Sequence, residues 1–204
     1  MLKVECFVPR GYFGSNTYLI EYEDVYAVID PSVEYEKVLK ARSEIEGKIK
    51  YILLTHCHFD HILKIDSWCK TGAEVIIGRE DRAGLSDPYV NCYLGFLGLN
   101  DGYFGTARCV DDGEVIPFGN MSIRVISCPG HTSGGVSYRI GNDIFVGDTV
   151  FAGGGYGRCD LPGGDIDVLE KTIIKLITIE NDAMLYPGHG DKTTLRDLII
   201  HFMQ

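Results

Sequence analysis

Short apolar runs alternate with glycine-containing turns in both halves of the chain. In the first half, the runs Lys3–Val8, Asn16–Tyr22 and Tyr26–Asp30 are predicted to be strands of a meander. The run Tyr51–Thr55 is apolar almost throughout, which indicates a strand buried on both faces. Glu74–Gly78 predicts one more strand in this half.

Helices are expected on either side of the buried strand. Pro31 ends the third run, and Ser32 is placed to cap a helix over Tyr35–Ile45. A second helix is predicted over Ile62–Thr71. Its apolar positions fall at helical spacing, which indicates a face packed in the core. These positions are Ile62, Ile65, Trp68 and Cys69.

The second half shows the same order, with strands first and helices later. Strands are predicted over Ser122–Ser127, Val136–Ile140, Ile144–Val146 and Ala183–Tyr186, and helices over Asp165–Ile179 and Thr194–Phe202. Gly141-Asn142 supplies a two-residue hairpin turn. We therefore expect a single domain over residues 1–204 with an α/β fold. It would be a four-layer αββα sandwich of two sheets with helices on both outer faces.

The segment Ser86–Tyr103 departs from this regular pattern. It combines glycines with four aromatic side chains, and its apolar positions have little periodicity. Long irregular segments often line functional sites, so we predict a lid or a pocket wall here. The alternative is a surface loop whose aromatic side chains only complete the core.

Composition and charge narrow the class of protein. The chain has 204 residues, of which 45% are apolar, and this excludes a disordered or fibrous protein. Its formal charge of −10 argues against a nucleic-acid or anionic-membrane partner. Seven cysteines, an odd number without a C-x-x-C pair, favour reduced thiols in a cytoplasmic protein. We expect neither a signal peptide nor a membrane span.

A cluster of histidines follows the buried strand directly. Side chains alternate in an extended segment, so His56 and His58 project to one side and can bind one ion. Asp60 and His61, at the turn into the next helix, can face a second ion. Imidazole and carboxylate groups together suit zinc or iron rather than calcium or magnesium.

Three later glycine-rich loops each carry one further candidate ligand after a predicted strand. These are His131, Asp148 and His189. Taken alone, Asp148 is more typical of a turn or cap residue, but the seven side chains together indicate a metal site. The remaining histidine, His201, is assigned no role.

Three more residues near these motifs have competing interpretations. Cys57 should point away from His56 and His58, although a role as a metal ligand stays open. Arg158 and Asp160 are expected to form a buried pair beside the metals that clamps a loop. The alternative is contact with an anionic substrate.

These motifs resemble the metallo-β-lactamase superfamily, and within it the glyoxalase II-like hydrolases. The signature H-x-H-x-D-H is met by residues 56–61, and Asn16–Ile20, Ile29–Pro31 and Gly157–Asp165 carry the narrower resemblance. The resemblance implies one metal held by His56, His58 and His131 and a second held by Asp60, His61 and His189, with Asp148 bridging them. Two zinc ions are implied, although iron and manganese also occur in such relatives.

The expected function is metal-dependent hydrolysis of a small thioester, such as a hydroxyacyl-thiol. Two ions share a hydroxide in such a site, and Asp60 would be the catalytic residue that orients it. A thiolate leaving group needs little help from a general acid. Two departures from glyoxalase II stand out. Only 15 residues follow His189, where that family carries a glutathione-binding domain, and Ile62-Leu63-Lys64 replaces smaller residues.

Other activities remain as alternatives at this point. A persulfide dioxygenase shares much of the motif set but uses a single iron held by two histidines and an aspartate. Hydrolysis of a lactone or a phosphoester is another alternative. A β-lactamase is disfavoured because Asp148 stands where many of those enzymes have cysteine, and an RNA nuclease is disfavoured by the charge. A metal-binding module without catalysis is the alternative from another class.

Overall fold

Two stacked sheets with helices on both outer faces make up the computed structural model, which describes residues 1–11, 13–179 and 183–202. The first sheet contains β1 (Lys3–Phe7), β2 (Thr17–Tyr22), β3 (Val25–Ile29), β4 (Ile49–Leu53), β5 (Glu74–Gly78) and β6 (Arg108–Val110), in this order. The second contains β12 (Thr193–Thr194), β11 (Met184–Pro187), β10 (Asp143–Gly147), β9 (Val136–Ile140), β8 (Met121–Ser127) and β7 (Val115–Phe118).

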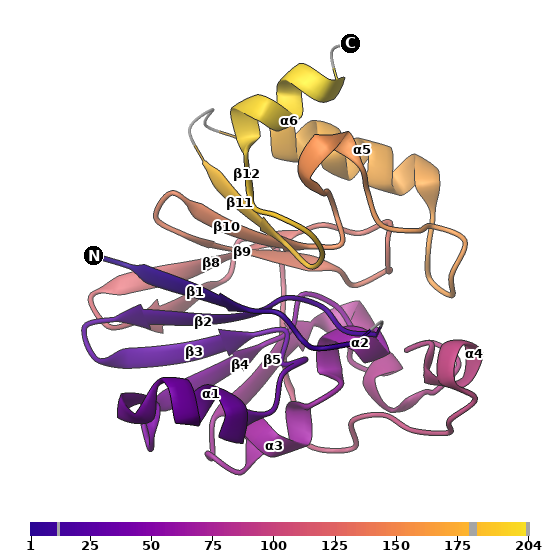
Figure 1. Ribbon diagram of the computed structural model, residues 1–204. Helices are drawn as coiled ribbons and strands as arrows, with labels where there is room; N and C mark the ends of the chain where they lie inside the picture. Colours follow the sequence, from indigo (N-terminus) through magenta and orange to yellow (C-terminus); the bar gives the residue numbers. More distant parts are fainter. Residues whose placement is uncertain (12, 180–182, 203–204) are drawn as a thin grey trace.

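The helices lie outside the sheets, as the sequence predicts. They are α1 (Tyr35–Ala41), α2 (Phe59–Ile62), α3 (Ile65–Cys69), α4 (Tyr93–Leu97), α5 (Ile166–Ile177) and α6 (Leu195–Phe202). Figure 1 shows α1 and α3 below the first sheet and α5 and α6 above the second. The predicted four-layer α/β fold is confirmed. Among the described residues, no helix is both long and apolar enough to cross a membrane.

Three apolar clusters fill the three spaces between these four layers. Alternation along β4 shows how one strand serves two of them. Tyr51 and Leu53 pack between the sheets, whereas Ile52 and Leu54 pack against the helices of the first sheet. The third cluster lies between the second sheet and helices α5 and α6. The prediction of a strand buried on both faces is therefore confirmed.

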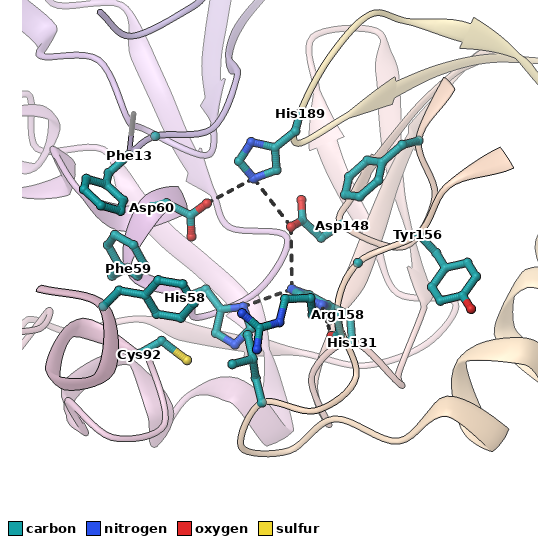
Figure 2. A pocket seen from close by; sticks show the side chains of 15 residues that line it. Phe13, His58, Phe59, Asp60, Cys92, His131, Asp148, Tyr156, Arg158 and His189 are labelled. Carbon is teal, nitrogen blue, oxygen red and sulfur yellow. Dashed lines mark hydrogen bonds and ion pairs between the residues drawn. The ribbon is translucent and has the colours of Figure 1, made fainter. Parts of the chain in front are cut away.

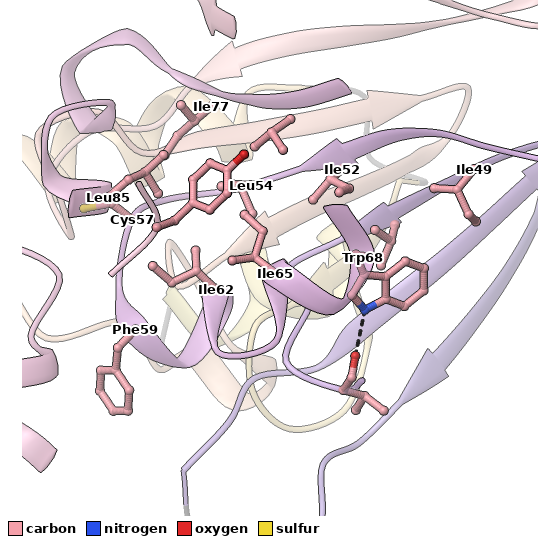
Figure 3. Packing of buried hydrophobic residues seen from close by; sticks show 14 of the residues in the cluster. Ile49, Ile52, Leu54, Cys57, Phe59, Ile62, Ile65, Trp68, Ile77 and Leu85 are labelled. Carbon is pink, nitrogen blue, oxygen red and sulfur yellow. Dashed lines mark hydrogen bonds between the residues drawn. The ribbon is translucent and has the colours of Figure 1, made fainter. Parts of the chain in front are cut away.

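The apolar face predicted around Trp68 lies in the core, as Figure 3 shows. Trp68 is fully buried, and its indole Nε1 donates a hydrogen bond to the Val33 carbonyl at 2.7 Å. Ile62 and Ile65 pack in the same cluster, and Cys69 packs at its edge. The indole bond joins α3 to the segment that follows β3, which fixes α3 against the sheet.

Both helix predictions of the first half were partly wrong. The helix predicted over Tyr35–Ile45 ends at Ala41, and a 3-10 turn covers Ser43–Ile45. Ser32 does not cap it, because the Ser32 hydroxyl instead accepts a hydrogen bond from the Ser15 N–H at 3.1 Å. A tertiary contact has replaced the local one.

The helix predicted over Ile62–Thr71 is divided into α2 and α3. The break falls at Lys64, whose N–H donates to the Pro31 carbonyl at 2.9 Å. This hydrogen bond to a distant segment takes the donor away from the helix and turns the chain between the two short helices. Asp60 and His61 therefore lie on the separate short helix α2.

The strand predictions also required correction at several ends. Strand β4 ends at Leu53, because the Thr55 N–H donates to the Asp30 carboxylate at 2.8 Å rather than to a neighbouring strand. The hydrophobic pattern of the sequence does not reveal β6, β7 and β12. These strands have three, four and two residues, which is too short for a period-two pattern to stand out.

Candidate metal centre

The loops that carry the candidate ligands meet at one edge of the sandwich. They follow β4, β8, β10 and β11. Strand β4 runs parallel to β3, and β11 runs parallel to β10. Nitrogen and oxygen atoms of all seven side chains predicted as ligands fall into three overlapping groups, each within 4.8 Å. The groups are His56, His58 and His131; His56, His61 and Asp148; and Asp60, His61 and His189.

The first ligand group, His56, His58 and His131, is buried. His131 Nε2 lies 3.2 Å from His56 Nε2 and 2.9 Å from His58 Nδ1. Nitrogen atoms bound to zinc at about 2.0–2.1 Å in a tetrahedral arrangement lie roughly 3.4 Å apart. The three nitrogens are therefore close to the spacing that a shared ion requires.

The second ligand group, Asp60, His61 and His189, is more open. Asp60 Oδ2 lies 3.0 Å from His189 Nε2 and 3.6 Å from His61 Nε2. His61 is fully buried, whereas the His189 side chain is 40% exposed. This group therefore lies where solvent and a small molecule reach it.

Asp148 lies between the two ligand groups (Figure 2). Its Oδ1 is 3.3 Å from His61 Nε2, and its Oδ2 is 3.5 Å from His189 Nε2 and 3.7 Å from His131 Nε2. Gly188 permits this arrangement, because a Cβ there would lie 2.2 Å from Asp148 Oδ1. One carboxylate thus faces ligands of both groups.

The residues present fit divalent cations. Among the described residues, His58 Nε2, His61 Nε2 and Asp148 Oδ1 are buried and have no hydrogen-bond partner. Buried polar atoms without partners are costly, and imidazole and carboxylate atoms facing one another are the donor set of zinc and iron. A bound cation would give His61 Nε2 and Asp148 Oδ1 the partner they lack.

Asp30 and Thr55 orient two of the imidazoles. The Asp30 carboxylate accepts a hydrogen bond from His61 Nδ1 at 2.8 Å and from the Thr55 hydroxyl at 2.7 Å. Since the Thr55 proton is used in this way, His56 Nδ1, at 3.1 Å, donates to the Thr55 oxygen. Both imidazoles therefore direct Nε2 rather than Nδ1 toward the candidate centre, as a metal ligand requires.

His131 is oriented in the same way by the backbone. Its Nδ1 donates to the Arg158 carbonyl at 2.7 Å, which leaves Nε2 toward the first ligand group. A carbonyl oxygen can only accept, so the tautomer of His131 follows directly.

The two ligand groups differ in their electrostatics. Burial, together with the neighbouring imidazoles, lowers the pKa of His56 well below its ordinary value, and burial lowers that of His58 to about 3. Burial also acts to lower the pKa of His61, but Asp60 and Asp30 outweigh it and raise that pKa well above the ordinary value. His56 and His58 thus offer neutral nitrogens, whereas the carboxylates around His61 attract positive charge.

Asp81 ties the loops of the first ligand group together, and the sequence analysis missed it. It is buried, and its Oδ2 accepts from the Cys57 N–H at 3.0 Å and the Thr132 hydroxyl at 2.8 Å. Its Oδ1 accepts from the Gly134 N–H at 2.6 Å. These partners are 24 to 53 residues away, so no local pattern reveals the contact.

Asn16 performs the corresponding task for the His189 loop. Its side-chain Nδ2 donates to the carbonyls of Pro187 at 3.1 Å and Gly190 at 2.9 Å, and its backbone N–H donates to Gly188 at 2.7 Å. The sequence analysis included Asn16 only as part of a family motif. The structure supplies its physical role, which is to hold β2 against the His189 loop.

A pocket of about 390 Å³ opens beside both ligand groups. The segment Ser86–Tyr103 contributes Cys92 and Phe96 to its lining, so the prediction of a pocket wall is confirmed for this part. The prediction does not hold for Tyr93 and Tyr103, which are buried in the core. The segment therefore serves both the pocket and the core.

The predicted pair of Arg158 and Asp160 forms, but the prediction that it is buried is wrong. The two side chains form a bidentate pair at 2.9 and 2.7 Å, but they are 58% and 69% exposed. Arg158 nevertheless lines the pocket.

Cys57 packs in the core and His201 is exposed on α6, and neither belongs to a ligand group among the described residues.

Comparison with known proteins identifies the family. The sequence profile of the metallo-beta-lactamase superfamily matches residues 10–189, and the chain belongs to this superfamily. A crystal structure of the BLEG-1 B3 metallo-beta-lactamase superimposes with a TM-score of 0.87 at 29% identity, covering 98% of this chain and 97% of that one.

Two curated relatives show the range of named activities. The chain is 30% identical to the probable polyketide biosynthesis zinc-dependent hydrolase PksB of Bacillus subtilis, over 90% of this chain and 77% of the relative. It is also 30% identical to the hydroxyacylglutathione hydrolase GloC of Haemophilus influenzae, over 92% and 91%. Members of the superfamily are mostly metal-dependent hydrolases that bind divalent metals, which agrees with the cluster of histidines and aspartates.

Proposed function

We propose that the protein is a dinuclear metal hydrolase that cleaves a small thioester. The observation that carries this proposal is the position of Asp148, whose carboxylate faces His131 of one ligand group and His61 and His189 of the other. A carboxylate shared in this way suits two neighbouring cations better than one. The proposed ligands are His56, His58 and His131 for one ion and Asp60, His61 and His189 for the other.

The side chains around these positions suit hydrolysis of a carbonyl compound. When bound, two divalent ions supply a water that is activated at neutral pH and a Lewis acid for the carbonyl oxygen. Asp60 lines the pocket, and its Oδ2 is held by His189, so its carboxylate can orient a nucleophile and hold its proton. We therefore assign Asp60 the catalytic role.

The pocket lining favours a leaving group that needs no acid. Beside the proposed ligands, Cys92, Tyr156 and Arg158 are the lining groups that carry a titratable proton. Burial raises the pKa of Cys92 to about 11, so this thiol is a poor acid at neutral pH. A thiolate leaves without protonation, and the similarity to a hydroxyacylglutathione hydrolase supports the same class of substrate.

A metal-quantified activity screen tests this proposal. The protein, loaded with zinc, iron or manganese, is assayed on thioesters, lactones and phosphodiesters. We expect turnover of thioesters with two ions bound, zinc being the proposed metal. Turnover of phosphodiesters alone would refute the proposal. Oxygen uptake with a persulfide, together with one iron per chain, would instead establish the dioxygenase alternative.

A further inference from the structure

One wall of the pocket is a row of three phenylalanines. The ring centroids of Phe13 and Phe59 are 6.2 Å apart, and those of Phe59 and Phe96 are 5.5 Å apart. Phe59 is buried, whereas Phe13 and Phe96 are 49% and 43% exposed. Figure 2 shows Phe13 and Phe59 beside Asp60, so this aromatic row borders the proposed catalytic carboxylate.

The rest of the lining adds three large apolar or aromatic side chains beside the candidate ligands. Phe151, Tyr156 and Leu161 line the pocket as well, and the Phe151 ring lies 6.0 Å from the His189 ring. A molecule that reaches the second ligand group therefore passes between apolar side chains. Such a surface binds an apolar group by removing it from water.

The charge of the lining argues against an anionic group as the main recognition element. Arg158 is the one lysine or arginine among the lining residues that the structure describes. Its guanidinium already pairs with Asp160 and lies over the Phe96 ring at 5.7 Å. Its charge is thus compensated, and its planar face extends the aromatic row.

We propose that this pocket selects its substrate by an apolar acyl group, such as a hexanoyl chain or a phenylacetyl group, rather than by a small hydroxyacyl group. The inference rests on the proposed thioester hydrolysis. In that reaction water adds to the acyl carbon and the carbon–sulfur bond breaks. The thiolate leaves with the electron pair of the broken bond, the oxygen of water becomes part of the new carboxylate, and both protons of water are released.

The first experiment varies only the acyl group. The metal-loaded protein is assayed on thioesters of one neutral thiol, N-acetylcysteamine, that carry acetyl, lactoyl, butanoyl, hexanoyl or phenylacetyl groups. Each methylene group that is fully buried raises kcat/KM about fourfold. Because the rings here are half exposed, we expect an increase of about twofold for each added methylene. The hexanoyl ester should therefore exceed the acetyl ester by about 16-fold. Equal values, or a preference for lactoyl, would overturn the inference.

The second experiment removes part of the aromatic row. Phe96→Ala should raise KM for the hexanoyl ester and leave KM for the acetyl ester nearly unchanged, with metal content and Tm preserved. Tyr89→Ala is the matched control, because Tyr89 is an exposed aromatic of the same segment outside the pocket lining. An equal loss on both esters in Phe96→Ala would contradict an acyl-binding role.

A binding measurement separates this inference from the proposed reaction. The S-hexyl and S-methyl thioethers of N-acetylcysteamine are not hydrolysed, and calorimetry compares their affinities in the wild type and in Phe96→Ala. Tighter binding of the hexyl compound, lost in the variant, supports the acyl site even if no thioester is turned over, in which case only the proposed function fails. Equal affinities overturn the inference whatever the activity.

Discussion

The two ligand groups of the centre differ in how they are enclosed. His56, His58 and His131 are buried, and the two loops that carry these three histidines are joined through the buried Asp81. In the second group His189 reaches the pocket, and Asp60 is partly exposed. Both groups border the pocket, but the first is buried and the second is more exposed there.

This difference separates structural from chemical roles within one centre. In the first ligand group, hydrogen bonds to Thr55 and to the Arg158 carbonyl orient His56 and His131 before any ion arrives, which reduces the cost of ordering them. The second ligand group keeps the Asp60 carboxylate close to His61 and His189, where it favours positive charge. We therefore expect the first group to bind its ion more tightly and the second to exchange its ion with solvent.

Removal of the ions should have the largest effect on stability. It leaves buried polar atoms without partners and two neighbouring carboxylates without cations. A ligand at a hundredfold excess over Kd contributes about 2.7 kcal/mol per site, so a chelator should lower Tm by about 10 °C or more. Thermal unfolding with and without dipicolinate measures this. Two-step metal release is expected, and loss of both ions in one step would contradict the comparison.

Asp148→Ala should lower the metal content more than any other single ligand change. The side chain faces both ligand groups, so its loss removes negative charge from two cation positions at once. Elemental analysis after dialysis should find well below one ion per chain. Retention of one full ion would show that Asp148 serves a single position.

His189→Ala should affect the second ligand group alone. The other members of that group remain, but the pocket-side ligand is lost, and His189 is not a member of the first group. We expect one ion per chain and a loss of turnover. His201→Ala serves as the control, because this histidine lies outside the centre and should leave both ions in place. Equal metal loss in His189→Ala and Asp148→Ala would refute the distinction.

Asp81→Asn should produce the smallest of these changes. The asparagine amide keeps the shape of the side chain. It places an N–H donor opposite one of the groups that now donate a hydrogen bond to Asp81. Changes of this kind beyond the ligands cost about 10–100-fold in metal affinity. The loss should fall on the first ligand group, seen in the absorption spectrum of the cobalt-substituted protein. Asp111→Asn, an exposed carboxylate, is the matched control, and a loss confined to the second group would argue against this role.

Local spacing in the sequence was sufficient to predict that the candidate ligands His56 and His58 lie on one side of the chain, and to predict much of the fold. Alternation along an extended segment placed His56 and His58 on one side of the chain, and the structure has their nitrogens converging with that of His131. The same rule identified β4 as a strand buried on both faces. These features depend on neighbours in the chain, which the sequence displays directly.

Contacts between distant segments decided the rest. Ser32 and Lys64 form hydrogen bonds outside their own helices, and these bonds moved or divided the predicted elements. Tyr93 turned inward and Phe96 toward the pocket, although both belong to one aromatic-rich segment. The roles of Asp30 and Asp81 likewise depend on partners 24 to 53 residues away. Periodicity states which way a side chain points from its own element, but only the packed fold determines what it meets there.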